Sequence, residues 1–208
     1  MNEPETVVIV DDDEAVRSAL KLLLQTVGLT TRSFASATDF LAKWDLRAPG
    51  CLVLDVRMPG MSGLELQEQL NLRGAVLPVI FITGHGDVPM AVEAMQRGAF
   101  DFLQKPFRDQ DMLDAVTVAL EADRRRRAEE SGLNELKTRF ADLTAREKQV
   151  MTLVTTGLMN KQVAGMLSLS EVTVKIHRGS VMRKMGARTL ADLIRMAELL
   201  HLNSLELS

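Results

Sequence analysis

The stretch Val7–Val16, VVIVDDDEAV, runs from four apolar residues directly into three aspartates and a glutamate. Four consecutive apolar residues are typical of a strand that is buried on both faces. Adjacent carboxylates repel one another and raise each other's pKa, so a chain that places them side by side usually holds a cation there. The stretch therefore predicts a buried strand that ends at a metal site.

The composition indicates a globular protein. The chain has 208 residues, of which 46% are hydrophobic, enough for one or two domains with their own cores. Its single cysteine, Cys51, builds neither a disulfide framework nor a thiolate cluster, and its apolar neighbours predict a buried position. The apolar runs are too short for a bilayer span and the N-terminus is acidic, so we expect a soluble cytoplasmic protein with no membrane partner.

Charged residues are distributed unevenly along the chain. Lys and Arg number 10 against 17 Asp and Glu over residues 1–120, 6 against 5 over 121–140, and 9 against 6 over 141–208. An acidic N-terminal part and a basic C-terminal part indicate two domains with different partners. We expect a first domain over residues 1–120, a helical linker over 121–140 and a second domain over 141–208.

Short β-type segments alternate with amphipathic segments of helical length over the first 120 residues. The helical segments include Glu14–Val27 and one that begins at Asp87 and ends at Gly98, and Ser62 with Glu65 forms a capping box at the start of another. Five strands that alternate with five helices predict an α/β fold with a doubly wound parallel sheet. The predicted strands are residues 6–10, 30–34, 51–55, 78–83 and 100–104.

The β signal disappears after Leu143. A capping box at Thr144 and Glu147 opens the first of four short amphipathic segments, and Gly157 ends it. These segments predict a small all-α domain.

The linker contains four consecutive arginines, Arg124–Arg127. Such a run is either a nucleic-acid patch or a solvated helix face paired with nearby acids. Four acids lie close by in the sequence, which favours the solvated face: Glu121, Asp123, Glu129 and Glu130.

Polar residues stand at the ends of four predicted strands. Asp11 and Asp12 follow the first, Asp55 ends the third, Thr83 the fourth, and Lys105 follows the fifth. Ligands of doubly wound sheets bind beyond the carboxyl ends of the strands, so these side chains are expected to meet. The carboxylates suit Mg²⁺, an aspartate can attack phosphorus, and a lysine and a threonine can contact the phosphoryl oxygens. The set predicts a site that makes and holds a phosphoaspartate.

Residues 5–120 resemble the receiver domain of two-component response regulators. The resemblance rests on the motifs VDDDE, LDVRMPGMSG, FITGHGD and AVEAMQRGAFDFLQKPF in this order. It implies a flavodoxin-like sheet of order 2-1-3-4-5, Asp55 as phosphoacceptor, and a cis peptide at Lys105-Pro106. It further implies that Mg²⁺ is held by Asp11, Asp12, Asp55 and the backbone carbonyl of Arg57, and that Thr83 and Lys105 contact the phosphoryl group.

Several of these residues also have structural interpretations. Asp12 and Asp13 are suited to capping the first helix, and Thr83 is a common type of strand residue. Phe102 is either core or, as in the resembling family, an aromatic that turns inward when the threonine moves to the phosphate.

The segment EVTVKIHRGSVMRKM, residues 171–185, predicts a helix with two different faces. Val174, Val181 and Met185 form a core-facing stripe, whereas Lys175, Ile176, Gly179 and Arg183 lie opposite. A helix with cations and a small residue outward fits the major groove of DNA, with Asn160 and Lys161 of the preceding helix near phosphates. The alternative is a solvated surface helix. Candidate DNA-binding residues are Asn160, Lys161, Thr173, Lys175, Ile176, Arg178, Gly179 and Arg183.

Residues 141–200 resemble the LuxR-type four-helix helix-turn-helix, and both halves together resemble response regulators of the FixJ/NarL type. The resemblance implies a transcription factor, by analogy with the family an activator, that a sensor histidine kinase phosphorylates at Asp55. Phosphorylation would promote a homodimer through the fourth helix and fifth strand, around Val92, Met95 and Asp101, which binds double-stranded DNA and RNA polymerase. Gly179 stands where the wider family often has a basic residue, so the resemblance leaves open which residues set sequence specificity.

Three rival functions remain. A haloacid-dehalogenase-type phosphatase also uses aspartates and Mg²⁺, but it needs a general acid two residues after its nucleophile, where this chain has Arg57. A receiver with an RNA-binding antiterminator output would lack a recognition helix. A receiver that works without phosphorylation is disfavoured by the complete set of acids, threonine and lysine.

Overall fold

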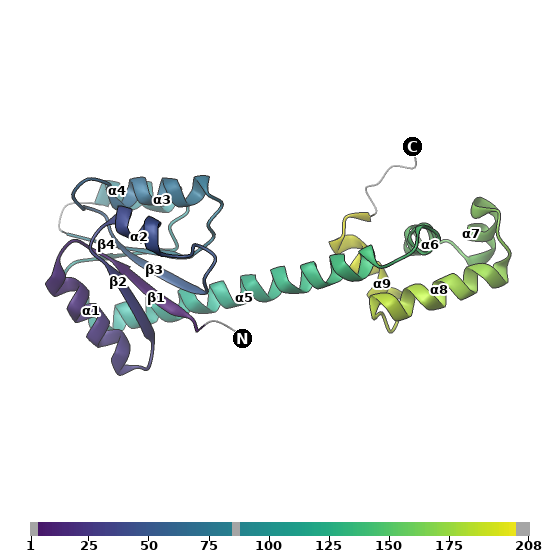
Figure 1. Ribbon diagram of the computed structural model, residues 1–208, viewed down its shortest axis with the longest axis horizontal. Helices are drawn as coiled ribbons and strands as arrows, with labels where there is room; N and C mark the ends of the chain where they lie inside the picture. Colours follow the sequence, from purple (N-terminus) through teal and green to yellow (C-terminus); the bar gives the residue numbers. More distant parts are fainter. Residues whose placement is uncertain (1–3, 85–87, 203–208) are drawn as a thin grey trace. The chain divides into compact units, whose positions relative to one another are not determined.

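The computed structural model describes residues 4–84 and 88–202 of the chain. The chain forms two compact units, one ending at Arg127 and the other beginning at Ala128. The first unit contains strands and helices and the second contains helices alone, and each has its own core (Figure 1).

The first unit contains a five-stranded parallel sheet of order β2-β1-β3-β4-β5, which confirms the predicted fold and topology. β1 and β3 are buried at every residue, as expected of central strands covered on both faces. The observed strands lie within one residue of the predicted ones and are β1 (Thr6–Val10), β2 (Thr30–Phe34), β3 (Gly50–Asp55), β4 (Val79–Thr83) and β5 (Asp101–Gln104).

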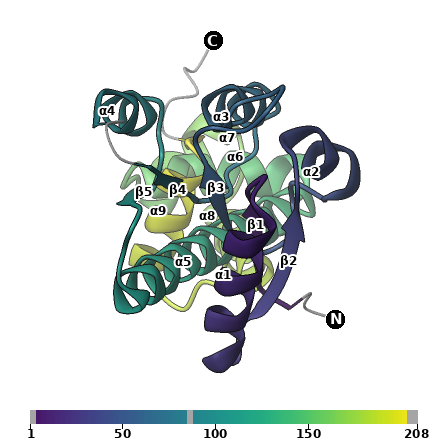
Figure 2. The ribbon, with the colours of Figure 1, turned by 90° about the vertical axis from the view of Figure 1, so that its left-hand side faces the viewer.

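Helices cover both faces of this sheet (Figure 2). One layer consists of α1 (Glu14–Thr26) and the first part of α5 (Asp109–Ala141); the other consists of α2 (Ala37–Lys43), α3 (Gly63–Leu72) and α4 (Val88–Gln96). The side chains of Asp13 and Ser62 cap α1 and α3, and the capping box of Ser62 with Glu65 is present as predicted. Asp87, the predicted start of the fourth helix, lies outside the described residues.

Successive side chains along the strands pack alternately into two separate cores. In β1, Val8 and Val10 face α2 and α3, whereas Val7 and Ile9 face α1 and α5. Cys51 belongs to the second of these cores and is fully buried, as predicted, and this burial raises the pKa of its thiol to about 12. The sheet is therefore held from both sides, and only its edges are free to present polar groups.

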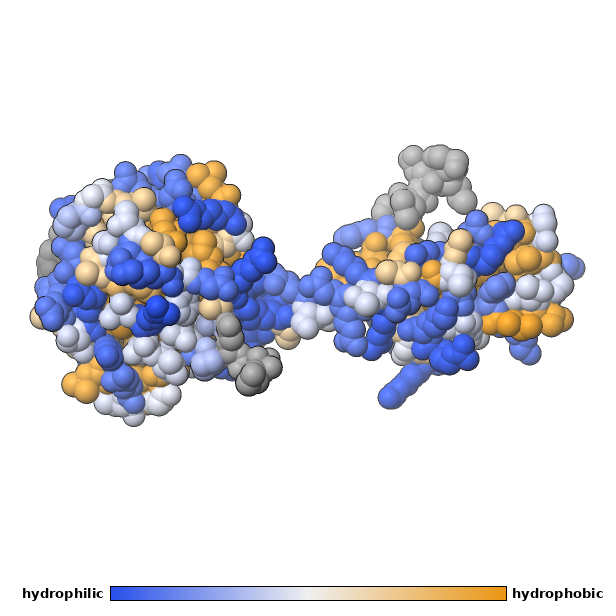
Figure 3. Space-filling model, viewed as in Figure 1, coloured by the Kyte–Doolittle hydropathy of each residue, from blue (hydrophilic) through white to orange (hydrophobic). Residues whose placement is uncertain are grey.

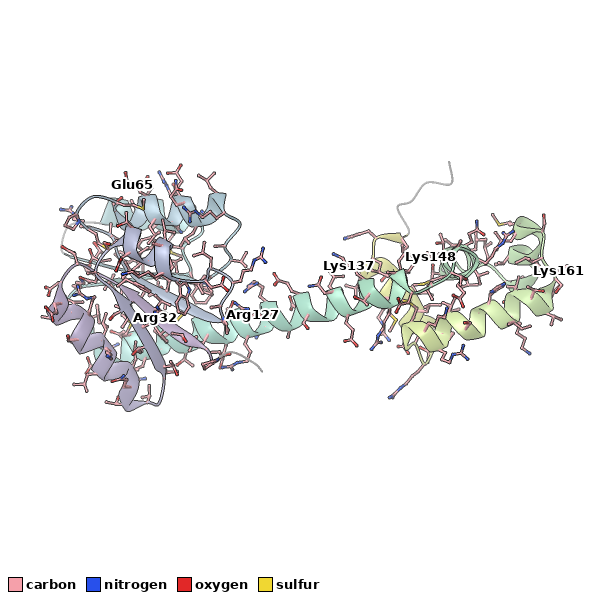
Figure 4. All side chains as sticks on the ribbon, viewed as in Figure 1. Arg32, Glu65, Arg127, Lys137, Lys148 and Lys161 are labelled. Atoms are coloured by element: carbon pink, nitrogen blue, oxygen red, sulfur yellow. The ribbon has the colours of Figure 1, made fainter. Side chains whose placement is uncertain are left out.

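The arginine run lies on α5, and Arg124, Arg126 and Arg127 pair with acids, as the interpretation of a paired face predicts, although Arg126 and Arg127 are half-buried rather than fully solvated. Arg124 forms a bidentate pair with Glu5, and Arg126 and Arg127 bind Asp123. Arg127 is labelled in Figure 4. Asp123 is 2% exposed and also accepts a hydrogen bond from the backbone N–H of Gly50 at 3.0 Å. The predicted linker, 121–140, thus falls inside one continuous helix, of which residues up to 127 belong to the first unit.

The second unit is all-helical. Leu136 and Phe140, near the end of α5, contribute to a core in which Val174, Val181 and Met185 are fully buried, so the predicted core stripe of the third helix is confirmed. Its other helices are α6 (Ala145–Thr155), α7 (Asn160–Leu167), α8 (Glu171–Met185) and α9 (Leu190–Leu199). Across both units, none of the helices in the described ranges has the length and apolar character needed to cross a membrane.

Candidate functional site

Four predicted site residues lie at the carboxyl edge of the sheet in the first unit. Asp11 follows β1, Asp55 ends β3, Thr83 ends β4, and Lys105 follows β5. The first three are almost completely buried, with exposed fractions of 1%, 6% and 1%. The parallel sheet therefore brings together side chains that are far apart in the sequence, as the strand-end pattern predicts.

Lys105 connects two of the acids. Its ammonium Nζ donates to Asp55 Oδ1 at 2.8 Å and to Asp11 Oδ2 at 2.9 Å. The Lys105 backbone N–H also donates to the carbonyl oxygen of Thr83 at 2.7 Å, and the following peptide bond, Lys105-Pro106, is cis as predicted. The two carboxylates thus converge on one cation at the sheet edge.

The environment changes the proton affinity of both partners. Burial raises the pKa of the Asp55 carboxyl, and the hydrogen bond and charge of Lys105 oppose this effect without cancelling it. Burial acts to lower the pKa of Lys105, but the hydrogen bonds and charges of Asp55 and Asp11 outweigh it and raise that pKa. Lys105 therefore stays charged and supplies a fixed positive group beside Asp55.

Backbone groups hold the two carboxylates in place. Asp11 Oδ1 accepts from the N–H of Asp13, and Asp55 Oδ2 accepts from the N–H of Arg57, each at 2.8 Å. Sequence reasoning missed Gly63, at the start of α3, where a Cβ would overlap the carbonyl oxygen of Asp55. Because it has no Cβ, Gly63 lets α3 approach the end of β3 closely. In the sequence, its place directly after the capping serine marks it as the first residue of a helix but does not indicate this close approach.

The donor set fits a hard divalent cation. Asp11 and Asp55 offer carboxylate oxygens, the backbone of Arg57 adjoins them, and Asp12 is exposed beside Asp11. In the described part of the chain, however, no three His, Cys, Asp or Glu side chains form a ready-made metal cluster. The ammonium of Lys105 instead bridges the two buried acids, which shows that this edge accommodates positive charge between them.

The remaining predicted residues of the first unit lie around α4 and β5. Phe102 is half-buried and packs against the core beneath α3 and α4, which is compatible with both of its interpretations. On α4, Val92 and Met95 are 53% and 47% exposed, and Asp101 at the start of β5 is half-buried. Exposed apolar side chains on α4 and a half-buried acid at the start of the neighbouring β5 therefore occupy this part of the unit.

In the second unit, one face of α8 is exposed along its length. Residues 172, 175, 176, 179 and 183 follow helical spacing on the side opposite the buried stripe. This face carries the predicted cations Lys175 and Arg183. Apolar surface gathers at the end of the unit formed by α7 and the start of α8 (Figure 3), where the exposed large apolar residues are Met159, Met166, Val172 and Ile176.

The other candidate DNA-binding residues lie where α7 meets α8. Arg178 donates to the side-chain oxygen of Asn160 at 3.1 Å, so these two residues contact each other. Lys161 is exposed in the first turn of α7 (Figure 4), and the Thr173 hydroxyl lies 2.8 Å from that of Ser170, the residue that caps α8. Ser168, with φ of 55°, forms the turn between the two helices.

Glu147 fixes α8 against α6. It is 5% exposed, accepts from Lys184 at 2.7 Å and from the Ser180 hydroxyl, and completes a capping box with Thr144. The hydrogen bond of Lys184, followed by that of Ser180, lowers the pKa of Glu147 to about 2. Sequence reasoning found the capping box but missed the contacts with α8, because they join residues more than 30 positions apart.

Both halves of the chain match known families. Residues 7–117 match the response regulator receiver domain, and residues 141–197 match the luxR family of bacterial regulatory proteins. The nodulation protein W of Bradyrhizobium diazoefficiens is 54% identical over 95% of this chain and 87% of its own length. The transcriptional regulatory protein FixJ of Azorhizobium caulinodans is 47% identical, with 95% and 93% covered.

A solved structure agrees with these matches over nearly the whole chain. The response regulator StyR is 48% identical and has a TM-score of 0.86, with 94% of this chain and 98% of that chain covered. The receiver match and the luxR match are consecutive in this chain and occur in the order expected from the two units. The chain therefore belongs to the two-component response regulators that carry a LuxR-type DNA-binding domain.

Proposed function

We propose that this response regulator is a transcription factor controlled by Mg²⁺-dependent phosphorylation of Asp55. The observation that carries the proposal is the convergence of Asp11, Asp55 and Lys105 at one sheet edge, with Thr83 at the end of the adjacent strand. Family membership implies a kinase partner and DNA; the choice of phosphoacceptor and the consequences of phosphorylation are our inference.

Asp11, Asp12, Asp55 and the backbone carbonyl of Arg57 would hold the metal. Receiver domains as a family use Mg²⁺, which when bound neutralises charge on the phosphoryl oxygens. The acids of this chain also keep Lys105 charged and in place, since its ammonium is hydrogen-bonded to two of them. A carboxylate oxygen of Asp55 forms the new P–O bond while the P–N bond to the histidine of a sensor kinase breaks. Lys105 and the Thr83 hydroxyl then contact the phosphoryl oxygens.

The kinase has to contact the surface beside Asp55. A groove of about 490 Å³ lies between α1 and the segment after β5, and Lys105 forms part of its lining. Its other walls are mainly apolar and include Val16, Leu20, Leu23 and Phe107. An apolar surface next to the phosphoacceptor suits a protein donor that buries part of its own surface during transfer.

Phosphorylation would change the surface of α4 and β5. We infer that Thr83 moves toward the phosphoryl group and that Phe102 turns inward behind it. Val92, Met95 and Asp101 then pair with the same surface of a second receiver, giving a homodimer. The exposed apolar area at Val92 and Met95 supports this assignment.

The dimer would bind double-stranded DNA through the second unit. The exposed face of α8 enters the major groove, and α7 lies near phosphates. Contacts are assigned to Asn160, Lys161, Thr173, Lys175, Ile176, Arg178, Gly179 and Arg183. We expect the DNA-bound dimer to act in the cytoplasm as an activator that contacts RNA polymerase.

The test compares the protein with Asp55→Asn after treatment with acetyl phosphate and Mg²⁺, using Asp45→Asn as a control at an exposed aspartate. We expect mass spectrometry to find one phosphoryl group on the protein and the control but none on Asp55→Asn, and only the first two to dimerise. If Asp55→Asn still dimerises in response to acetyl phosphate, the assignment of the phosphoacceptor is wrong.

The rival functions have weaker support. The side chain of Arg57, where a dehalogenase-type phosphatase needs its general acid, is exposed and basic, so we expect no turnover of phosphate esters. An antiterminator output is opposed by the luxR-family match over residues 141–197.

A further inference from the structure

Two large apolar side chains project from the face of α8 that is assigned to DNA. Val172 and Ile176 are 69% and 66% exposed, and they stand one turn apart near the start of the helix. They share this face with Lys175, Gly179 and Arg183. The face thus combines two apolar groups near its start with one cation beside them and another toward its far end.

Folding does not explain these side chains. The core of the second unit uses the opposite stripe of α8, through Val174, Val181 and Met185. Val and Ile also favour a helix less than Ala does, so at exposed positions they weaken α8 rather than strengthen it. Their place in the helix therefore points to something outside the unit that covers them.

Gly179 adds a second unexplained feature to the same face. A Cβ built at Gly179 meets nothing within 4 Å, and its backbone does not adopt the positive φ that requires glycine. An exposed glycine inside a helix costs about 1 kcal/mol relative to alanine. Glycine is also the residue that allows the closest approach of a backbone to a ligand. A helix that comes close to the groove floor at Gly179 brings short side chains such as those of Val172 and Ile176 to the bases.

We propose that Val172 and Ile176 select thymine by packing against its C5-methyl group, so that apolar contact supplies the sequence specificity of this regulator. The inference rests on the proposed DNA-binding function, and it adds which base is recognised and by which kind of contact. Thymine presents the only methyl group among the four bases in the major groove, and aliphatic side chains recognise it by contact. The two residues lie about 6 Å apart along the helix axis, so the thymines that they contact lie within about two base-pair steps of each other.

Lys175 and Arg183 complete the face. Lys175 lies beside the two apolar residues, where it reaches a guanine edge or a phosphate, and Arg183 lies two turns further along, where it reaches the backbone. These cations position the helix, whereas the methyl contacts choose the sequence.

The experiment removes single methyl groups from the DNA. The full chain, treated with acetyl phosphate and Mg²⁺, is used to select duplexes from a library with a randomised central segment. Each thymine of the best duplex is then replaced by deoxyuridine, which lacks only the methyl group, and the Kd is measured by fluorescence anisotropy. We expect one or two thymines in each half-site at which the replacement weakens binding roughly fourfold, the effect of one buried methyl group.

Variants of the protein connect each methyl group to a side chain. Val172→Ala and Ile176→Ala should each weaken binding to the thymine duplex by a similar factor. The affinity of each variant should no longer change when deoxyuridine replaces thymine at one of these positions. Both substitutions introduce a better helix former, so the unit should stay folded by circular dichroism. Leu72→Ala, at an exposed position of α3 in the first unit, is the matched control and should keep the full sensitivity.

Failure of this inference differs from failure of the proposed function. If duplexes are selected but no thymine is sensitive, or the sensitivity survives in the double variant Val172→Ala/Ile176→Ala, methyl recognition by these residues is wrong. If no duplex is retained at all, DNA binding itself is wrong, and the inference falls with it.

Discussion

At the scale of single residues, the ammonium of Lys105 holds the buried carboxylates of Asp11 and Asp55 together at the carboxyl edge of the sheet. Because parallel strands end on the same side of a sheet, the sequence predicts that Asp11, Asp55, Thr83 and Lys105 meet at one edge, and the structure brings them there. The direct contact of Lys105 with both acids depends on side-chain geometry, which spacing does not encode. Gly63 was missed for the same reason, since its closeness to Asp55 follows from the packing of α3.

Glu147 carries a pH prediction. Its pKa in the folded protein is lowered to about 2, chiefly by Lys184 and then by Ser180, from an ordinary value of 4.5. A carboxyl with a depressed folded pKa contributes stability that is fully present above the unfolded pKa and is lost as the pH falls through the folded one. The second unit should therefore lose stability between about pH 4.5 and pH 2, and Glu147→Gln should remove this part of the pH dependence.

The measurement is thermal unfolding by circular dichroism across this pH range. At neutral pH, Glu147→Gln should destabilise the second unit by about 2 kcal/mol, the usual loss for a hydrogen bond to a charged group. The single tryptophan, Trp44, lies in the first unit, so its fluorescence should report an unchanged transition. Glu198→Gln, at an exposed position on α9, is the control; an equal effect from it would contradict the role of Glu147.

At the scale of elements, the strands were predictable and the contacts of α5 were not. Strands buried on both faces produce short continuous apolar runs, and these runs predict β1, β3 and β4 to within one residue. The edge strands β2 and β5 are more exposed, and their place follows from the alternation with helical segments. The arginine run was correctly read as a paired helix face, but the partner of Arg124 is Glu5 rather than a neighbour on α5. Arg127 similarly donates to the carbonyl oxygen of Arg47, a contact between segments 80 positions apart.

Asp123 should hold the arginine-bearing part of α5 onto the first unit. Its buried carboxylate accepts from the Gly50 N–H and pairs with Arg126 and Arg127. Burial acts to raise the pKa of this carboxyl, but the hydrogen bonds of these partners outweigh it and hold the pKa below its usual value. Asp123→Asn leaves buried donors poorly paired and should destabilise the first unit by about 2 kcal/mol. Because the helix would then open more often near Arg124–Arg127, trypsin should cut there several times faster.

Limited proteolysis followed by mass spectrometry measures the cutting rate at these arginines. Asp114→Asn, an exposed aspartate on the same helix, should leave both the rate and the stability of the first unit unchanged. Equal cutting of the protein and Asp123→Asn would show that the carboxylate does not hold α5 in place.

At the scale of the whole molecule, the proposed function couples the two units through the number of recognition helices that bind one DNA. Two linked recognition helices on a two-fold operator bind with an affinity that exceeds that of one helix by about 10²–10⁴, because the second contact is intramolecular. Under the proposed function, the receiver surface around Val92 and Met95 would control DNA affinity without touching DNA. A charge placed on this surface should remove the gain, since pairing would bury it without a partner.

Met95→Glu separates these two steps. The variant should accept a phosphoryl group at the normal rate, because Met95 is 47% exposed on α4 and none of the Asp11, Asp55 and Lys105 contacts involves it. It should remain a monomer by light scattering after acetyl phosphate treatment, and its affinity for the full operator should fall to that of the unphosphorylated protein. Affinity for a single half-site should not change, and Leu72→Glu, which places the same charge on exposed α3, should behave as the unaltered protein. A phosphorylated Met95→Glu that still dimerises would move the dimer surface away from α4 and β5, while leaving the chemistry at Asp55 intact.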